Sequence, residues 1–325
     1  ALADARVQAA DIDGVWIGNF SGGGFNSQEH LAPCAIDIHP DLRFKPVTRV
    51  ENACASGSAA IAAAKQAIEA GDAELALVIG VEKMTNLDTA GVTKVLAMAS
   101  HWPEEGELGM TFPGLFAEYA KGYMERHNIS PEDLRTLLAK VTAKNHRNAV
   151  ANPLAQMPWD CTYQDILDRP DKKNPVVAEP LRLFDCSLVS DGAAALILAS
   201  EAKAEELGLA GIEIAALVHT TDYLALDKRS KSEFVAGKQA IQKAYELAQI
   251  TVDDLDFAEV HDCFTIAEVL AYEALGLVPD GQGSRAIEEG LVEVGGKLPV
   301  NPSGGLKAKG HPVGATGVSM AVLAT

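Results

Sequence analysis

Short apolar runs alternate with stretches of small, helix-forming residues along most of this chain, and this alternation restricts the fold more than any other feature. Residues 14–18 and 75–81 have the apolar and β-branched character of buried strands, and the alanine-rich residues 57–70 between them predict a helix. Strands predicted at 193–199, 212–218 and 257–260 and helices predicted at 235–248 and 265–275 continue the order. Strands separated by helices are typical of α/β proteins.

The stretch from about residue 101 to residue 180 interrupts this order. It holds two of the three tryptophans, several prolines and one isolated helix, which begins after Ser130 as N-cap with Pro131 at its first position. We therefore predict an N-terminal half formed by residues 1–100 and 181–205, an inserted loop domain at 101–180, and a C-terminal half at 206–325.

The net charge and the cysteines indicate which partners and which cellular compartment suit this chain. A net charge of −18 disfavours nucleic acid and anionic membranes as partners. The five cysteines are odd in number and scattered, without a CxxC pair, which favours a reducing, intracellular compartment. No apolar run is long enough to span a bilayer, so we predict a cytoplasmic protein. The chain begins at Ala1 and not at a methionine, so this expectation allows for a targeting segment ahead of it.

Cys54 lies where an extended segment meets an alanine-rich helix, within Asn52-Ala-Cys-Ala-Ser-Gly57. Backbone N–H groups and the dipole at a helix N-terminus favour a thiolate, and the small residues 55–58 leave room for a substrate. A cysteine that only fills space is the alternative, and the position at a helix start favours the nucleophile. The cysteines without this setting are predicted packing residues: Cys34, Cys161 and Cys186.

A second reactive turn, His261-Asp262-Cys263-Phe264, stands between a predicted strand and a predicted helix. Three consecutive side chains do not converge on one metal from regular structure, so we expect no mononuclear metal site. A cysteine close to a histidine suits proton transfer, because its pKa can be brought near neutrality. An arrangement in which Asp262 caps the helix and its two neighbours are buried in the core is equally compatible with the spacing.

The third turn is glycine-rich and carries His311 between Gly310 and Pro312. Glycine permits turns that side chains would block, and proline stiffens the same stretch. Cysteine and histidine together are the minimum for nucleophilic acyl transfer, since an imidazole can activate the thiol and donate to an oxyanion. A glycine-rich turn with an incidental histidine is the alternative, and spacing alone does not bring the three turns together.

These turns together resemble the thiolase superfamily, and the resemblance covers nearly the whole chain. The segment around Cys54 resembles the nucleophile turn of that family, residues 310–312 its Gly-His-Pro motif, and residues 185–195 the segment that closes its N-terminal half. Most thiolases have Asn-Glu-Ala-Phe where this chain has residues 261–264. His-Asp-Cys-Phe there is similar to thiolases of the sterol-carrier-protein-2 type and related acetyl-CoA acetyltransferases.

The resemblance implies an α/β thiolase fold of five αβαβα layers, in which two similar halves carry an inserted loop domain over coenzyme A. It implies a homodimer that uses acetyl-CoA and other acyl-CoA thioesters in reversible condensation and thiolysis, with no metal or further cofactor. Cys54 would form the acyl-enzyme, and His311 would take the thiol proton. His261 would hold a water at the oxyanion site, and Cys263 would transfer the α-proton. The implied coenzyme A contacts are Met110, Phe112, Ser303 and Gly304.

Compared with full-length members of that family, the sequence lacks the first strand and helix and stops at Thr325 before the final strands. We therefore expect the Cys-x-Gly loop, with the second oxyanion hole, beyond this sequence. Lys307 and Lys309 are possible phosphate partners, but we expect them to be solvated lysines on a loop.

Two other functions remain open. A decarboxylating β-ketoacyl synthase on the same fold would use Cys54, His261 and His311 and leave Cys263 idle. A thiolase-like scaffold without catalysis would bind an acyl-CoA or a partner protein, but the presence of both cysteines and both histidines favours an enzyme. Acyl chain length and physiological direction do not follow from the sequence.

Overall fold

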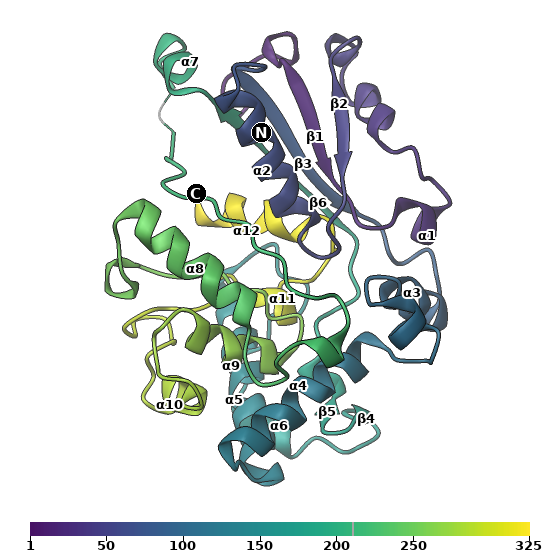
Figure 1. The fold of residues 1–325 in the computed structure, drawn as a ribbon, viewed down its shortest axis with the longest axis vertical. Coiled ribbons are helices and arrows are strands. Elements are labelled where there is room, and N and C mark those ends of the chain that lie inside the picture. The colour runs from purple at the N-terminus through teal and green to yellow at the C-terminus, as the bar shows by residue number, and fades with distance from the viewer. Residues whose placement is uncertain (210) are drawn as a thin grey trace. The chain divides into compact units, whose positions relative to one another are not determined.

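The structure is a computed structural model, and it describes residues 1–209 and 211–325. The chain divides into two compact units, drawn together in Figure 1. Unit 1 comprises residues 1–95, 189–214 and 311–325, apart from residue 210, and unit 2 comprises residues 96–188 and 215–310. The predicted halves, the inserted domain and the five layers stay predictions.

Unit 1 is built on a four-stranded sheet in the order β2 (Val47–Val50), β1 (Gly14–Gly18), β3 (Leu75–Glu82) and β6 (Gly192–Ala199). β1 runs parallel to β2 and β3, and β6 runs antiparallel to β3 along its whole length. The strands predicted at 14–18, 75–81 and 193–199 are confirmed. Because parallel strands end at one edge, the segments that follow β1, β2 and β3 leave the sheet on the same side.

Two helices rest on one face of this sheet, α2 (Ser56–Glu69) and α12 (Thr316–Ala324), and both can be followed in Figure 1. Gly18 and Gly80 are register partners on that face. A Cβ atom on Gly18 would lie 2.6 Å from the Cα of Gly57 in α2. A Cβ atom on Gly80 would lie 2.8 Å from the Cα of Ala315, where α12 begins. Glycine is therefore required where the sheet and the two helix starts meet.

The opposite face of the sheet carries the apolar core of unit 1. Val15, Ile17 and Leu77 point to this face and pack with Ile12 and Leu42, and all five side chains are nearly inaccessible to solvent. Burial of such a side chain stabilises a fold by about 1.5–3 kcal/mol. The remaining helices of residues 1–95 and 189–214 are short: α1 (Gly22–Asn26), α3 (Thr89–Ala97, which ends in unit 2) and α7 (Glu201–Glu206).

Unit 2 is mostly helical. It contains a two-stranded antiparallel sheet, β4 (Val176–Ala178) with β5 (Leu181–Arg182), and a set of α-helices. The helices are α4 (Phe112–His127), α5 (Pro131–Asn148), α6 (Tyr163–Leu167), α8 (Val235–Ala248), α9 (Thr265–Ala274), α10 (Gly283–Glu288) and α11 (Gly305–Ala308). The helices predicted from residue 130 and at 57–70, 235–248 and 265–275 are confirmed, including the Ser130 cap, which accepts the Asp133 N–H.

Helix α4 was not predicted. Its start is nevertheless encoded locally, because the Thr111 side chain accepts the N–H of Gly114 at 3.2 Å and Pro113 occupies the first turn. Its buried face, which includes Tyr119 and Tyr123, joins the apolar core of unit 2. Within the described residues, no helix combines the length and the apolar character that a bilayer crossing requires.

The strands predicted at 212–218 and 257–260 are wrong. Residues 212–218 have no regular secondary structure, and in 257–260 only Ala258 forms an isolated bridge, to Val300. A strand exists only through hydrogen bonds to a neighbouring strand, and neither segment has such a ladder among the residues that the structure describes. The apolar pattern is present, but Ile212 remains 66 % exposed.

Candidate active site

Cys54 lies in the turn between β2 and α2. Ala53 has a φ of +48°, in the left-handed region that alanine seldom occupies. The Ser56 hydroxyl holds this turn, since it accepts the N–H of Asn52 at 2.8 Å and donates to the carbonyl of Ala53 at 2.6 Å. The Glu51 carboxylate accepts the N–H of Ala53 at 2.6 Å. These bonds stabilise a strained backbone that places Cys54 just before the helix.

Burial raises the pKa of the Cys54 thiol to about 12, and the negative charge of Glu82 acts in the same direction. A backbone hydrogen bond lowers this pKa but does not reverse the shift. The prediction that the helix start holds Cys54 as a thiolate is therefore wrong for the free protein, because desolvation outweighs the helix N-terminus. A raised pKa favours the thiol form, so a nucleophilic Cys54 would need a base.

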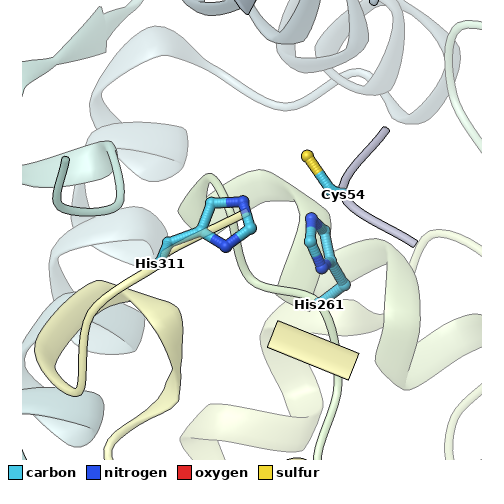
Figure 2. Close-up of side chains that lie close together, drawn as sticks. All are labelled: Cys54, His261 and His311. Carbon is cyan, nitrogen blue, oxygen red and sulfur yellow. The ribbon is translucent and has the colours of Figure 1, made fainter. Parts of the chain in front are cut away.

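His311 is a candidate for this base within the same unit. One of its ring nitrogens lies within 4.8 Å of the Cys54 sulfur, and Figure 2 shows both side chains. Its Nδ1 lies 2.7 Å from the Thr316 hydroxyl oxygen, which also lies 3.2 Å from the carbonyl of Pro312. The backbone N–H of His311 donates to the Ser190 hydroxyl at 3.1 Å. The imidazole is thus fixed from both its ring and its backbone.

The hydrogen bonds of Thr316 assign the tautomer of His311. The hydroxyl carries one proton, and the carbonyl of Pro312 can only accept. If the Thr316 hydroxyl donates its proton to this carbonyl, its oxygen is left to accept the Nδ1–H of His311. This arrangement satisfies the hydroxyl, the carbonyl and the imidazole nitrogen. Nε2 is then the basic nitrogen of a neutral imidazole. A thiol and an imidazole from two neighbouring turns of unit 1 form an acid–base pair suited to acyl transfer.

His261 and Cys263 belong to unit 2, in the segment that leads into α9. Burial lowers the pKa of His261 to about 4, and the charge of Lys309 acts in the same direction, so His261 is neutral at physiological pH. Cys263 is buried at 4 % exposure, and its carbonyl accepts the N–H of Ser187 at 2.9 Å. The roles of His261 and Cys263 stay predictions.

Asp262 does not cap α9, so that part of the alternative is wrong, whereas the buried Cys263 does belong to the core of unit 2. Its carboxylate accepts the N–H groups of Leu306 and Lys307 at 2.7 and 3.2 Å, at the start of α11 in the glycine-rich turn. Asn145 donates to the same carboxylate at 2.9 Å and to Glu268 at 2.6 Å. Burial, with the charge of Glu268 next, raises the pKa of Asp262 to about 7. The chain between His261 and Cys263 is thereby tied to residues 305–308.

A fully buried ion pair underlies this connection. The Lys144 ammonium lies 2.7 Å from the Glu268 carboxylate, and neither side chain is exposed. Lys144 also donates to the carbonyl of Val300, and Asn301 donates to Glu268 at 2.8 Å. This network was not predicted from the sequence. The available signal was a charged residue on the inward face of each helix, although these faces also carry polar residues such as Asn145 and Thr265.

The comparisons with known proteins agree with this geometry. A family model described as "Thiolase, N-terminal domain" matches residues 1–202, and one described as "Thiolase C-terminal domain-like" matches residues 219–325. The chain belongs to the thiolase family. The family resemblance noted in the sequence is therefore confirmed.

This thiolase has close relatives among enzymes. It is 42 % identical to the acetyl-CoA acetyltransferase of Methanothermobacter thermautotrophicus, over 99 % of this chain and 81 % of the relative. It is 35 % identical to human sterol carrier protein 2, over 98 % of this chain and 58 % of the relative. These relationships make the chain a thiolase-type acyltransferase.

Solved structures confirm the predicted α/β thiolase fold. Acetyl-CoA acetyltransferase from Syntrophomonas wolfei superposes with a TM-score of 0.71 at 22 % identity, over 99 % of this chain and 83 % of that chain. Human mitochondrial 3-ketoacyl-CoA thiolase in complex with CoA superposes with a TM-score of 0.69 at 19 % identity, over 99 % and 81 %.

Two residues that the thiolase resemblance assigns to coenzyme A, Ser303 and Gly304, lie in the glycine-rich segment of unit 2. Ser303 is 8 % exposed, and its hydroxyl and N–H donate to the Glu259 carboxylate at 2.7 and 3.0 Å. Gly304 has a φ of +100°, and a Cβ atom there would lie 2.6 Å from the Cβ of Ala149. Close packing against Ala149 therefore explains why position 304 is a glycine. Contacts with coenzyme A stay predictions for these two and for the half-buried Met110 and Phe112.

The prediction that Lys307 and Lys309 are solvated is wrong for this thiolase, because they are only 3 % and 8 % exposed. Lys307 donates to the carbonyl of Cys186 at 2.8 Å and lies over the ring of Phe184, and burial lowers its pKa to about 8. The Lys309 ammonium lies 3.8 Å from the Glu259 carboxylate. Both lysines belong to the interior of unit 2.

Proposed function

We propose that this thiolase catalyses reversible condensation and thiolysis of 3-ketoacyl-CoA, with acetyl-CoA as the two-carbon substrate and Cys54 as the acyl carrier. The observation that carries the proposal is the pairing of the Cys54 thiol with a His311 whose Nδ1 is occupied by Thr316. The acetyl-CoA acetyltransferases that share 41–42 % of its residues support the choice of substrate.

In the degradative direction, Nε2 of His311 takes the Cys54 proton as the sulfur attacks the C3 carbonyl of the 3-ketoacyl-CoA. The C2–C3 bond then breaks, the acyl group stays on Cys54, and the acetyl-CoA enolate leaves. Cys263 gives its proton to C2 of this enolate and so releases acetyl-CoA. We assign to His261 the binding of a water at the oxyanion site, where that water and His311 donate hydrogen bonds to the thioester oxygen of the enolate.

The second half-reaction restores the resting state. The thiol of free coenzyme A passes its proton to the Cys263 thiolate, and its sulfur attacks the acyl group on Cys54. The thioester exchange releases a shortened acyl-CoA, and Cys54 recovers its proton from His311. The thioester itself acidifies the α-carbon, so the proposed chemistry uses no metal and no cofactor besides coenzyme A thioesters.

Thiolysis of acetoacetyl-CoA by the purified chain tests this proposal. We expect acetyl-CoA to be formed, and mass spectrometry of the stopped reaction to find one acetyl group on Cys54. Cys54→Ala should lower the rate by more than a hundredfold. Cys34→Ala, which changes an exposed cysteine of the same unit, is the matched control and should leave the rate unchanged. A Cys54→Ala variant with normal thiolysis would contradict the assignment.

We further propose that the enzyme acts in lipid metabolism as a homodimer in the cytoplasm. The net charge of −18 fits a protein that avoids nucleic acids and anionic lipid surfaces. Analytical ultracentrifugation should find twice the mass of the chain at micromolar concentration, and a monomer at that concentration would refute the dimer.

A further inference from the structure

Glu82 is a buried carboxylate at the end of β3 in unit 1, and its side chain has no part in the mechanism described above. It is 1 % exposed. One oxygen accepts the Asn19 side-chain amide at 2.9 Å and the N–H of Ser21 at 3.2 Å. The other accepts the N–H of Phe20 at 2.8 Å and the N–H of Gly314 at 3.0 Å. A single carboxylate therefore joins the segment that follows β1 to the glycine-rich turn.

The four partners show that Glu82 is charged in this arrangement. Each of them is a donor, and an ionised carboxylate is the form that only accepts. A proton on either oxygen would face an N–H group and remove a hydrogen bond. Burial raises the pKa of Glu82, and the hydrogen bonds from these donors lower it. Charge-assisted bonds of this kind are about twice as strong as neutral ones.

The contact with Gly314 fixes the chain three residues beyond His311. A Cβ atom on Gly314 would lie 2.6 Å from the Glu82 carboxylate and 2.7 Å from the Cα of Asn19. Glycine is therefore needed for this close approach. Ser190 holds the N–H of His311, and Glu82 holds the turn after it, so the backbone around the imidazole is anchored on both sides.

We propose that Glu82 is a positioning residue for acyl transfer: by binding the Gly314 N–H it aims the His311 imidazole at the Cys54 thiol. This inference rests on the proposed function of Cys54 and His311. The carboxylate does not touch the substrate, and it acts through the backbone of the glycine-rich turn. A displacement of about 1 Å at a reacting group can lower a rate by about a hundredfold, so loss of this anchor should reduce turnover.

Glu82→Gln tests the inference, because an amide places an NH₂ donor against N–H donors while the side-chain volume is kept. We expect kcat for acetoacetyl-CoA thiolysis to fall about 10- to 100-fold per folded molecule, with KM within about threefold of wild type. Glu82→Asp, which keeps the charge but has a shorter reach, should give an intermediate kcat. Asp13→Asn is the matched control and should keep the wild-type kcat. Asp13 accepts two backbone N–H groups, of Glu74 and Leu75, at the opposite end of the same sheet.

Two further measurements separate positioning from general destabilisation. Hydrogen exchange of the peptide that covers residues 311–317 should be faster in Glu82→Gln and unchanged in Asp13→Asn. Gly314→Ala should also lower kcat, because its Cβ atom would push the turn away from the Glu82 carboxylate and from the Cα of Asn19. A Glu82→Gln variant with wild-type kcat, or with unchanged exchange in residues 311–317, overturns the inference. If the wild-type chain has no thiolase activity, the proposed function fails and the exchange measurement alone decides the role of Glu82.

Discussion

The hydrogen bond between His311 and Thr316 gives a prediction whose size follows from the structure. Nδ1 and the hydroxyl oxygen are 2.7 Å apart and both side chains are buried, so Thr316→Val leaves the Nδ1–H without this acceptor. A neutral hydrogen bond contributes about 0.5–1.5 kcal/mol and one to a charged group about 1.5–3 kcal/mol. In the proposed mechanism His311 starts neutral and becomes charged when it takes the Cys54 proton, so this bond should strengthen during the reaction.

The difference between the two states, about 1–2 kcal/mol, is the part that appears in kcat. It corresponds to a decrease of about 5- to 30-fold in thiolysis of acetoacetyl-CoA. The KM for acetoacetyl-CoA should change little, because Thr316 is 1 % exposed and acts through His311. The free energy of unfolding, measured with denaturant, should fall by about 1–3 kcal/mol, the cost of an unsatisfied buried donor.

Thr316→Ser is the control, since it keeps the hydroxyl and removes only a methyl group. Its kcat should stay within about threefold of wild type. The reasoning is refuted if Thr316→Val keeps the wild-type kcat, or if Thr316→Ser loses as much activity as Thr316→Val.

Three further outcomes are expected. Cys263→Ala should lower condensation of acetyl-CoA by more than a hundredfold, and retained condensation would exclude Cys263 as the proton-transfer group and favour the synthase alternative. The pKa of the Cys54 thiol is raised to about 12, so its thiolate fraction should rise about tenfold per pH unit up to pH 10. The rate of alkylation by iodoacetamide should rise in the same proportion. A plateau of this rate below pH 9 would contradict the raised pKa. Lys144→Met leaves Glu268 as an unpaired buried charge and should lower the free energy of unfolding by about 3–5 kcal/mol. Lys140→Met, at an exposed pair on the same helix, should lower it by less than about 1 kcal/mol. Equal losses in denaturant titrations would contradict the burial argument.

Local patterns were sufficient for much of the fold. Helix α5 follows from its Ser130 cap, and α8 and α9 follow from their helix-forming composition, signals that act within a few residues of the chain. The strands predicted at 212–218 and 257–260 failed for the opposite reason, since pairing with a distant segment decides whether an apolar run becomes a strand. The burial of Lys307 and Lys309 was missed because a lysine's sequence neighbours do not reveal its tertiary surroundings.

In the candidate site, too, local sequence marked some residues, and other features depended on tertiary contacts. A strand–turn–helix pattern with small residues was sufficient to single out Cys54, and the glycines and proline around His311 marked the second turn. The thiolate expectation was wrong because desolvation depends on the tertiary environment of the thiol. The contact between Glu82 and Gly314 joins residues 232 positions apart, so no short motif contains it.

The glycine contact between α2 and α12 has a consequence for how this enzyme tolerates change. A Cβ atom on Gly317 would lie 2.3 Å from the N atom of Ser58, so the two backbones meet directly at the first turns of these helices. Cys54 comes just before one helix and His311 just before the other. Main-chain contact between the two helix starts therefore contributes to the distance between sulfur and imidazole, together with the side-chain anchors Ser56, Ser190 and Glu82. We expect side chains of unit 1 that touch neither these anchors nor the two helix starts to tolerate variation, in evolution or in directed evolution, with little change in the separation of Cys54 and His311.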